Sequence, residues 1–318
     1  MITLGYALSS EEHGPDDLVR YAERAETSGF EFALVSDHFH PWTSTQGESP
    51  FVWSVLGGIA AATDDLRVGT GVTCPIGRIH PAIVAQAAGT VGTMLPDRFF
   101  LGVGTGENLN EHVLGEKLPA HEIRMDMLGE AVEIIRRLWQ GGELTYDGEH
   151  FTVENARLFT LPAEPPPIHV AASGPGMANV AGEFGDGLVS TAPEPEVVDA
   201  FRETADDGGP RYGQVTVCWD EDEQSAVETA LRHWPNAALP GELGQVLPTP
   251  AHFEQAVQLV DEDDIREAVV CGPDVQRHVD AIGEFVDAGF DHVYVHQVGP
   301  DQAAFFDVFE DEIRPSFG

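Results

Sequence analysis

The stretch LVSDHFHPW, Leu34 to Trp42, joins an apolar run to a dense set of polar and aromatic side chains. The run that enters it, Phe30–Ser36, has the composition of a buried β-strand, and the acidic, imidazole and indole groups follow where that strand ends. Polar groups at the end of a buried strand are typical of sites built on the carboxyl ends of parallel strands. The stretch therefore predicts a parallel α/β fold with a site at one end of its sheet.

Strand-like and helix-like segments alternate on both sides of this stretch. The other expected strands are Ile2–Leu8, Leu66–Val72, Arg98–Val103, Ile168–Ala172, Gly187–Thr191, Val215–Trp219 and His292–His296. Expected helices include Pro15–Ser28, Phe51–Thr63, Pro81–Met94 and Arg124–Trp139. About eight βα units with near-continuous apolar strands predict a (β/α)8 TIM barrel, and the alternative is an open, doubly wound sheet.

Two segments break the alternation. Residues 143–153 hold an Asp147-Gly148 turn between short β-prone runs, which predicts a hairpin insertion. Residues 235–250 are rich in Pro and Gly and are interpreted as an inserted loop. Because a barrel can use a chain of this length, residues 1–318 are expected to form a single domain with these two insertions.

The charge of the chain is extreme. The formal net charge is −38, and the only lysine is Lys117. Self-repulsion of this size is relieved by salt, since the Debye length falls to about 3 Å near 1 M. The composition predicts a halophilic protein of a salt-accumulating cytoplasm. No basic stripe exists to meet phosphates, so nucleic-acid binding is disfavoured.

Other sequence signals support a cytoplasmic protein. Neither a signal peptide nor an apolar run of the ~20 residues that a membrane helix needs is evident, so no membrane association is expected. The three cysteines, Cys74, Cys218 and Cys271, suit a reduced compartment and are expected to be buried apolar residues. No metal-ligand motif occurs, and we expect no metal.

Residues that could take part in catalysis or binding follow three of the expected strands. They are SDHFHPW (Ser36–Trp42), GTGVTCP (Gly69–Pro75) and GVGTGEN (Gly102–Asn108). His38 and Glu107 are proton-transfer groups, and Trp42 is suited to line a flat ring. Taken singly, each has a structural alternative: glycines relieve crowding, histidines cap or pack, and tryptophans pack. Their coincidence on neighbouring strands favours a site.

These motifs together resemble a known family. SDHFHPW, GTGVTCP, PAIVAQA (Pro81–Ala87) and RFFLGVGTGENLNE (Arg98–Glu111) resemble the F420-dependent dehydrogenases of the bacterial-luciferase-like superfamily. The nearest branch is that of the F420-dependent glucose-6-phosphate dehydrogenases. The likeness continues through IHVAASGP, GEFGDGLVST and DHVYVHQVGPDQ and so covers nearly the whole chain.

The resemblance implies coenzyme F420, a deazaflavin, as the cofactor. Asp37 would hydrogen-bond the ring system, and the Gly71-Val72 bond would be a non-proline cis peptide against the ring face. Thr105 and Gly106 would lie along the cofactor. The residues implied near its phosphate are Ser173, Gly174 and Gly176, where a strand passes into a helix N-terminus.

The resemblance also implies roles in hydride transfer. His38 and Trp42 would lie beside the reacting carbon, with His38 accepting the hydroxyl proton of a small-molecule alcohol or sugar. Glu107 would protonate the ring, and Glu11 would face the substrate. A homodimer is expected. The alternatives are an F420H2-dependent reductase and an FMN-dependent luciferase-like monooxygenase.

One feature departs from the glucose-6-phosphate branch. Its members hold the substrate phosphate with two lysines and an arginine. The first lysine position corresponds to Pro193, the second lies near Gly244-Gln245, and Arg266 stands near the place of the arginine. A phosphate dianion would lack its counter-charges here, so glucose 6-phosphate is disfavoured as the substrate.

Overall fold

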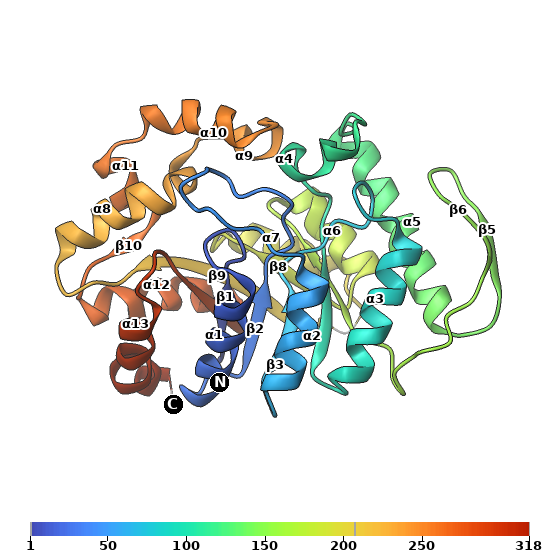
Figure 1. The fold of residues 1–318 in the computed structure, drawn as a ribbon, viewed down its shortest axis with the longest axis horizontal. Helices are drawn as coiled ribbons and strands as arrows, with labels where there is room; N and C mark the ends of the chain where they lie inside the picture. The colour runs from blue at the N-terminus through green and yellow to red at the C-terminus, as the bar shows by residue number, and fades with distance from the viewer. Residues whose placement is uncertain (1, 207, 318) are drawn as a thin grey trace.

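The computed structural model describes residues 2–206 and 208–317, and within them eight parallel strands close into a barrel (Figure 1). The barrel closes because β9 pairs in parallel with both β8 and β11. The strands are β1 Thr3–Leu8, β2 Phe32–Val35, β3 Arg67–Thr70, β4 Phe99–Val103, β7 Ile168–Ala171, β8 Gly187–Ser190, β9 Arg211–Cys218 and β11 His292–Gln297. The predicted TIM barrel is confirmed, and the open doubly wound sheet is wrong.

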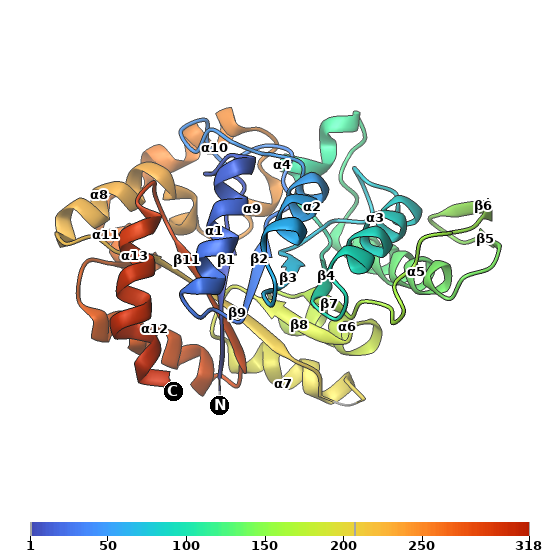
Figure 2. The same ribbon diagram turned by 60° about the horizontal axis from the view of Figure 1, so that its bottom comes forward.

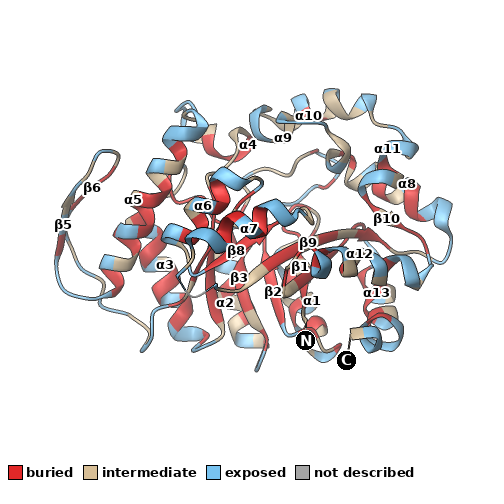
Figure 3. Ribbon diagram, turned by 180° about the vertical axis from the view of Figure 1, so that it is seen from behind, coloured by how far each residue is buried: buried red, intermediate tan, exposed pale blue. Residues whose placement is uncertain are grey.

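Helices surround the barrel and turn their apolar faces to it, so their inner sides are buried and their outer sides exposed (Figure 3). Proline begins several of them, where its missing N–H costs no hydrogen bond. The helices are α1 Pro15–Thr27, α2 Val52–Ala62, α3 Pro81–Met94, α5 His121–Trp139, α6 Pro175–Phe184, α7 Pro195–Thr204, α8 Glu223–His233, α12 Val275–Asp287 and α13 Gln302–Val308.

Aromatic rings fill the barrel interior. Phe32, Phe100 and Tyr212 are fully buried inside the sheet and pack on one another, with centroid distances of 5.1 Å and 5.2 Å to Tyr212. Gly69 on β3 makes room, because a Cβ there would lie 2.1 Å from the Phe100 ring. The interior is therefore a packed core, and a ligand has space only at an end of the barrel.

The first predicted insertion is confirmed as a hairpin. Strands β5 (Leu144–Asp147) and β6 (Thr152–Ala156) pair antiparallel, so the hairpin extends past the predicted limit of residue 153. Figures 1 and 2 both show it at one edge of the molecule, beyond α5 and away from the barrel mouth.

The second insertion, predicted as an inserted loop over 235–250, contains short helical segments joined by residues outside any helix. The prolines at 235 and 250 stand in the first turn of helical segments, a position that proline favours. The segments are η2 Pro235–Ala238, α9 Leu243–Val246, α10 Pro250–Ala256, η3 Val257–Leu259 and α11 Glu262–Ala268. In Figure 1, α9 and α10 lie at the same end of the barrel as α4 (Asn108–Glu111).

Smaller differences concern the bounds of elements. Helix α5 begins at His121, before the predicted Arg124, and β9 begins at Arg211, because its polar and glycine residues hide the strand signal. The remaining elements are η1 His112–Leu114, β10 Val270–Cys271, η4 Phe309–Ile313 and η5 Arg314–Phe317. All three cysteines are buried and unpaired, as predicted. Among the described residues, no helix combines the length and apolarity needed to cross a bilayer.

Candidate active site

A cavity of about 170 Å³ opens at the carboxyl end of the barrel strands. Three residues predicted as catalytic, Glu11, His38 and Trp42, line it together with Gly71. Glu11 follows β1, His38 and Trp42 follow β2, and Gly71 follows β3. Neighbouring parallel strands end at one rim, which is why residues far apart in the sequence meet here.

The His38 ring lies between two carboxylates. Its Nδ1 is 3.0 Å from Oε1 of Glu11, and its Nε2 is 3.5 Å from Oε1 of Glu107. The contact to Glu11 is at ion-pair distance but poorly aligned for a hydrogen bond. The other Glu11 oxygen accepts hydrogen bonds from the hydroxyls of Ser9 (3.0 Å) and Ser36 (2.7 Å).

This arrangement sets the protonation of the histidine. Burial alone would lower the pKa of His38, but the charges of Glu11 and Glu107 raise it to about 9. Burial would raise the pKa of Glu11, and His38 and the Ser36 hydroxyl lower it to about 2. In the free protein at neutral pH, His38 is therefore an imidazolium held by two carboxylates.

Trp42 forms one wall of the cavity. Its ring meets His38 edge-on, with centroids 5.0 Å apart, and packs against Phe253 of α10 at 5.1 Å. The Trp42 backbone N–H donates to the Gln46 side chain (2.8 Å), which fixes the loop that carries it. An indole held in this way presents a rigid apolar surface to a ligand.

Asn110 joins the loop after β2 to the loop after β4. Its carbonyl oxygen accepts from the backbone N–H groups of Phe39 (2.8 Å) and His40 (2.9 Å), and its amide donates to Glu107. Both sides of the His38–Glu107 contact are thus held by one buried side chain. The sequence reasoning did not single out Asn110, although its position one helical turn after Glu107 was a signal.

The Asp37 side chain is fully buried, and both of its carboxylate oxygens accept hydrogen bonds. One carboxylate oxygen accepts from the Thr73 hydroxyl (2.7 Å), and the other accepts from the Arg78 guanidinium (2.7 Å). A buried carboxylate needs such a partner, so the acid at the end of β2 was a signal for a nearby cation that the sequence reasoning did not follow. Each oxygen retains a further lone pair for a ligand.

The loops after β3 and β4 have unusual backbone geometry. The Gly71-Val72 peptide is cis, as the resemblance implied. Gly106 has φ +70°, and a Cβ there would lie 2.5 Å from the Cys74 sulfur. Arg124 of α5 donates to the carbonyl oxygens of Thr105 (3.2 Å) and Gly106, which anchors this loop from behind.

The residues predicted near the cofactor phosphate lie apart from the His38 cavity. Ser173 lines a second, larger pocket of about 940 Å³. Gly174 is the N-cap of α6 and Gly176 is in its first turn, and a Cβ at either position would meet no atom within 4 Å. This open space beside free helix N–H groups is a cradle suited to an anionic group, so the residues present fit a phosphate-bearing cofactor.

Comparison with known proteins gives a consistent result. The family of luciferase-like monooxygenases matches residues 2–292. The chain belongs to this family. Among curated luciferase-like relatives, the F420-dependent glucose-6-phosphate dehydrogenase of Intrasporangium calvum is 34% identical over 330 residues, covering 99% of this chain and 98% of that protein. That of Segniliparus rotundus is 35% identical over 327 residues, covering 99% and 97%.

A solved structure of the same kind is an F420-dependent secondary alcohol dehydrogenase in complex with an F420-acetone adduct. It is 32% identical, with a TM-score of 0.90 and coverage of 98% of both chains. The F420-dependent tetrahydromethanopterin reductase of Methanopyrus kandleri has a TM-score of 0.81 at 22% identity, which shows a shared fold.

Proposed function

We propose that this protein is an enzyme that transfers a hydride from the CH–OH carbon of a small alcohol or sugar to coenzyme F420. The observation that carries the proposal is His38, held between Glu11 and Glu107 at the barrel mouth. It is supported by similarity over nearly the whole chain to F420-dependent dehydrogenases. The deazaflavin, when bound, supplies a ring carbon that accepts a hydride, so the protein has to position the alcohol and manage its proton.

The residues divide this work by position. His38, once it has lost its own proton, accepts the proton of the substrate hydroxyl, and Glu11 keeps the ring oriented. Trp42 confines the alcohol, and Glu107, after it takes up a proton from solvent, would donate that proton to the ring nitrogen of the cofactor. The proposed ring contacts come from Asp37, Gly71, Val72, Thr105 and Gly106, and the proposed phosphate contacts from Ser173, Gly174 and Gly176.

The cavity favours an uncharged substrate. Among the described residues that line it, none is a lysine or an arginine. Arg266, the arginine considered for a phosphate, instead lies 3.4 Å from Glu262 and 3.6 Å from Glu223. A sugar phosphate would bring two negative charges next to Glu11, where the one cation of the cavity, His38, is already held by two carboxylates, so we infer a neutral secondary alcohol or sugar as the hydride donor.

We further infer a homodimeric, single-domain enzyme of residues 1–318 in a salt-rich cytoplasm. The net charge of −38 supports the salt requirement. On the barrel helix α3, Ile83 and Met94 are 57% and 45% exposed, which supports burial of this face against a second copy. Light scattering and thermal unfolding in dilute buffer and in molar salt test both points: a monomer, or a protein destabilised by salt, would contradict them.

The test of the function is cofactor reduction. The purified protein in high salt is mixed with oxidised F420 and a panel of neutral secondary alcohols, sugars and glucose 6-phosphate. We expect the visible absorbance of F420 to fall with a neutral alcohol or sugar and to be unchanged with glucose 6-phosphate. Binding of FMN in place of F420, with oxygen uptake, would overturn the proposal. Oxidation of F420H2 without reduction of F420 would show that hydride transfer runs from the cofactor to the substrate.

The rate of alcohol oxidation is expected to rise with pH. The pKa of His38 is raised to about 9, so the ring is protonated at neutral pH and must lose its proton before it accepts another. We expect kcat/KM to increase about tenfold per pH unit below that value and to level off above it. Ketone reduction, which needs the protonated ring, is expected to decline above pH 9. A flat profile for alcohol oxidation between about pH 6 and 10 would contradict this assignment.

A further inference from the structure

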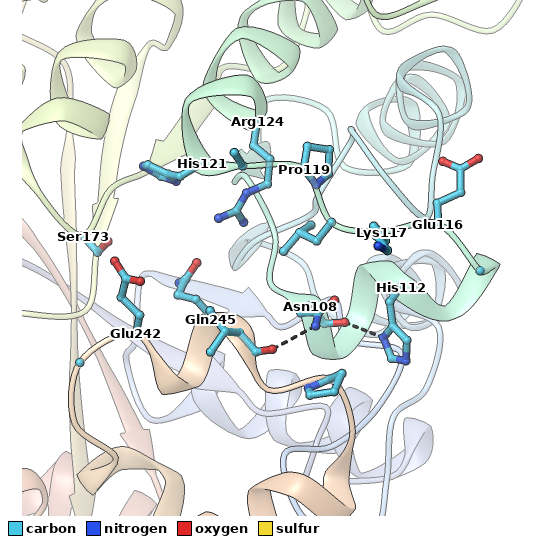
Figure 4. A pocket seen from close by; sticks show the side chains of 16 residues that line it. Asn108, His112, Glu116, Lys117, Pro119, His121, Arg124, Ser173, Glu242 and Gln245 are labelled. Carbon is cyan, nitrogen blue, oxygen red and sulfur yellow. Dashed lines mark hydrogen bonds between the residues drawn. The ribbon is translucent and has the colours of Figure 1, made fainter.

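The second pocket lies beside the proposed cofactor site but apart from its catalytic end. It is enclosed by the segment from α4 to α5 on one side and by α9 on the other, with Ser173 at one end (Figure 4). The Asn108 side chain donates to the Val246 carbonyl oxygen (3.0 Å) and so ties α4 to α9 across it. With a volume of about 940 Å³, the pocket is much larger than the 170 Å³ cavity at His38.

Cationic side chains gather in this pocket although the chain is strongly acidic. Lys117, the only lysine among the 318 residues, lines it together with Arg124. Within residues 2–206 and 208–317, neither side chain takes part in an ion pair, whereas Arg78, Arg211 and Arg266 each contact a carboxylate. Five other arginines, Arg67, Arg98, Arg157, Arg232 and Arg314, also lack an ion pair within the described residues, so what distinguishes Lys117 and Arg124 is that they line the same pocket.

Arg124 is buried and retains a hydrogen-bond donor without a partner. The residue is only 6% exposed, and its Nε–H has no hydrogen-bond partner. Its Nη1 group donates to the backbone carbonyl oxygens of Thr105 and Gly106, and burial lowers the pKa of the guanidinium. Figure 4 shows the guanidinium pointing to the centre of the pocket, between Lys117 and Ser173. A desolvated cation of this kind, without a carboxylate, is a binding group for an anion.

The acids of the pocket limit where an anion can lie. Glu116 and Glu242 are both exposed, and in Figure 4 the Glu116 carboxylate points away from the pocket centre. The Glu242 carboxylate stands near Ser173, on the wall opposite Lys117. Repulsion from Glu242 therefore directs a negatively charged ligand to the side of Arg124 and Lys117.

We propose that Lys117 and Arg124 bind the negatively charged part of the cofactor that extends beyond its ring. The proposal rests on the proposed function and deepens it, because Ser173 and the α6 N-terminus connect this pocket to the cofactor loops. Arg124 then has two functions: it anchors the loop of Thr105 and Gly106 from behind, and it meets an anionic group in front.

The test compares two ligands on variants that differ in one charge. The ligands are coenzyme F420 and its ring portion with an uncharged side chain, which lacks the phosphate and carboxylates. The variants are Lys117→Gln and Arg124→Gln, and Arg157→Gln, an exposed arginine beside the β5–β6 hairpin, is the matched control. Dissociation constants are measured by fluorescence at two salt concentrations, and inorganic phosphate is titrated as a competitor.

We expect Lys117→Gln to raise the Kd of F420 about 2–5-fold and Arg124→Gln about 10–100-fold. The effect at the exposed Lys117 should shrink in high salt. The Kd of the uncharged ring should not change in Lys117→Gln. Inorganic phosphate should compete with F420 and not with the uncharged ring. Equal competition with both ligands would overturn the assignment of this pocket to the charged part of the cofactor.

Two other results would sink the proposal. Equal F420 affinity in Lys117→Gln and Arg157→Gln would show that the pocket does not recognise the negatively charged part of the cofactor. Equal weakening of F420 and of the uncharged ring shows that the loop, and not an anion site, was disturbed. If the wild-type protein binds neither ligand, both this proposal and the proposed function are wrong. Lys117→Gln decides the question even where Arg124→Gln fails to fold, since Lys117 is exposed.

Discussion

His38→Gln is expected to lower kcat for alcohol oxidation by about 10²–10⁴-fold while F420 binding is retained. Glutamine keeps hydrogen-bonding capacity near Glu11 and Glu107 but cannot take up a proton. The ring of His38 lines the 170 Å³ cavity, so the loss should fall on the chemical step and not on the cofactor. Single-turnover reduction of F420, with a parallel measurement of its Kd, separates the two.

A matched histidine outside the cavity controls for this experiment. His252→Gln on α10 makes the same change at an exposed position and should leave kcat unaltered. The residual activity of His38→Gln should also lose the dependence on a group with a pKa of about 9. A variant that keeps kcat within a few-fold, or keeps the same pH profile, would remove His38 from the role of base.

The second large effect concerns stability. Arg78→Met is expected to lower the free energy of unfolding by about 3–5 kcal/mol, because it leaves a buried carboxylate without a counter-charge. The Asp37 side chain is 0% exposed and that of Arg78 is 8% exposed, so solvent cannot replace the 2.7 Å contact. Urea unfolding at one fixed salt concentration measures the change.

A double variant shows whether the loss of stability in Arg78→Met comes from the unpaired charge of Asp37. Asp37→Asn in the Arg78→Met background removes that charge, and most of the lost stability should return. Additive losses in the double variant would mean that the two residues act independently. The double variant is also expected to bind F420 weakly, since the neutral amide replaces a carboxylate at the proposed ring site.

The pattern along the chain was sufficient to predict the barrel. Apolar strands separated by amphipathic helices are local features, and their period and proline starts can be read within about ten residues. The same rules failed at residues 235–250, where proline marks the first turn of short helices but also marks loops. Helix α9 has only four residues, and its place over α4 depends on the contact from Asn108 to Val246.

The candidate site was predictable in its residue types and partly in its members. Acid, imidazole and indole at the end of a buried strand indicated chemistry at the barrel mouth, and the structure places Glu11, His38 and Trp42 around one cavity there. The supporting residues were not predictable. Asn110 contacts a loop 70 positions earlier in the chain, and Arg78 meets Asp37 across 41 positions.

The sequence by itself determined the fold class, the acidic surface and the residue types at the strand ends, because periodicity, composition and strand termini are properties of neighbouring residues. Only the tertiary structure decided the charge state of His38, since its pKa depends on two carboxylates brought from other strands. It also decided that Arg266 pairs with two glutamates while Lys117 and Arg124 line one pocket and, among the described residues, form no ion pair. Electrostatic partners are set by distance in space, which spacing along the chain does not encode.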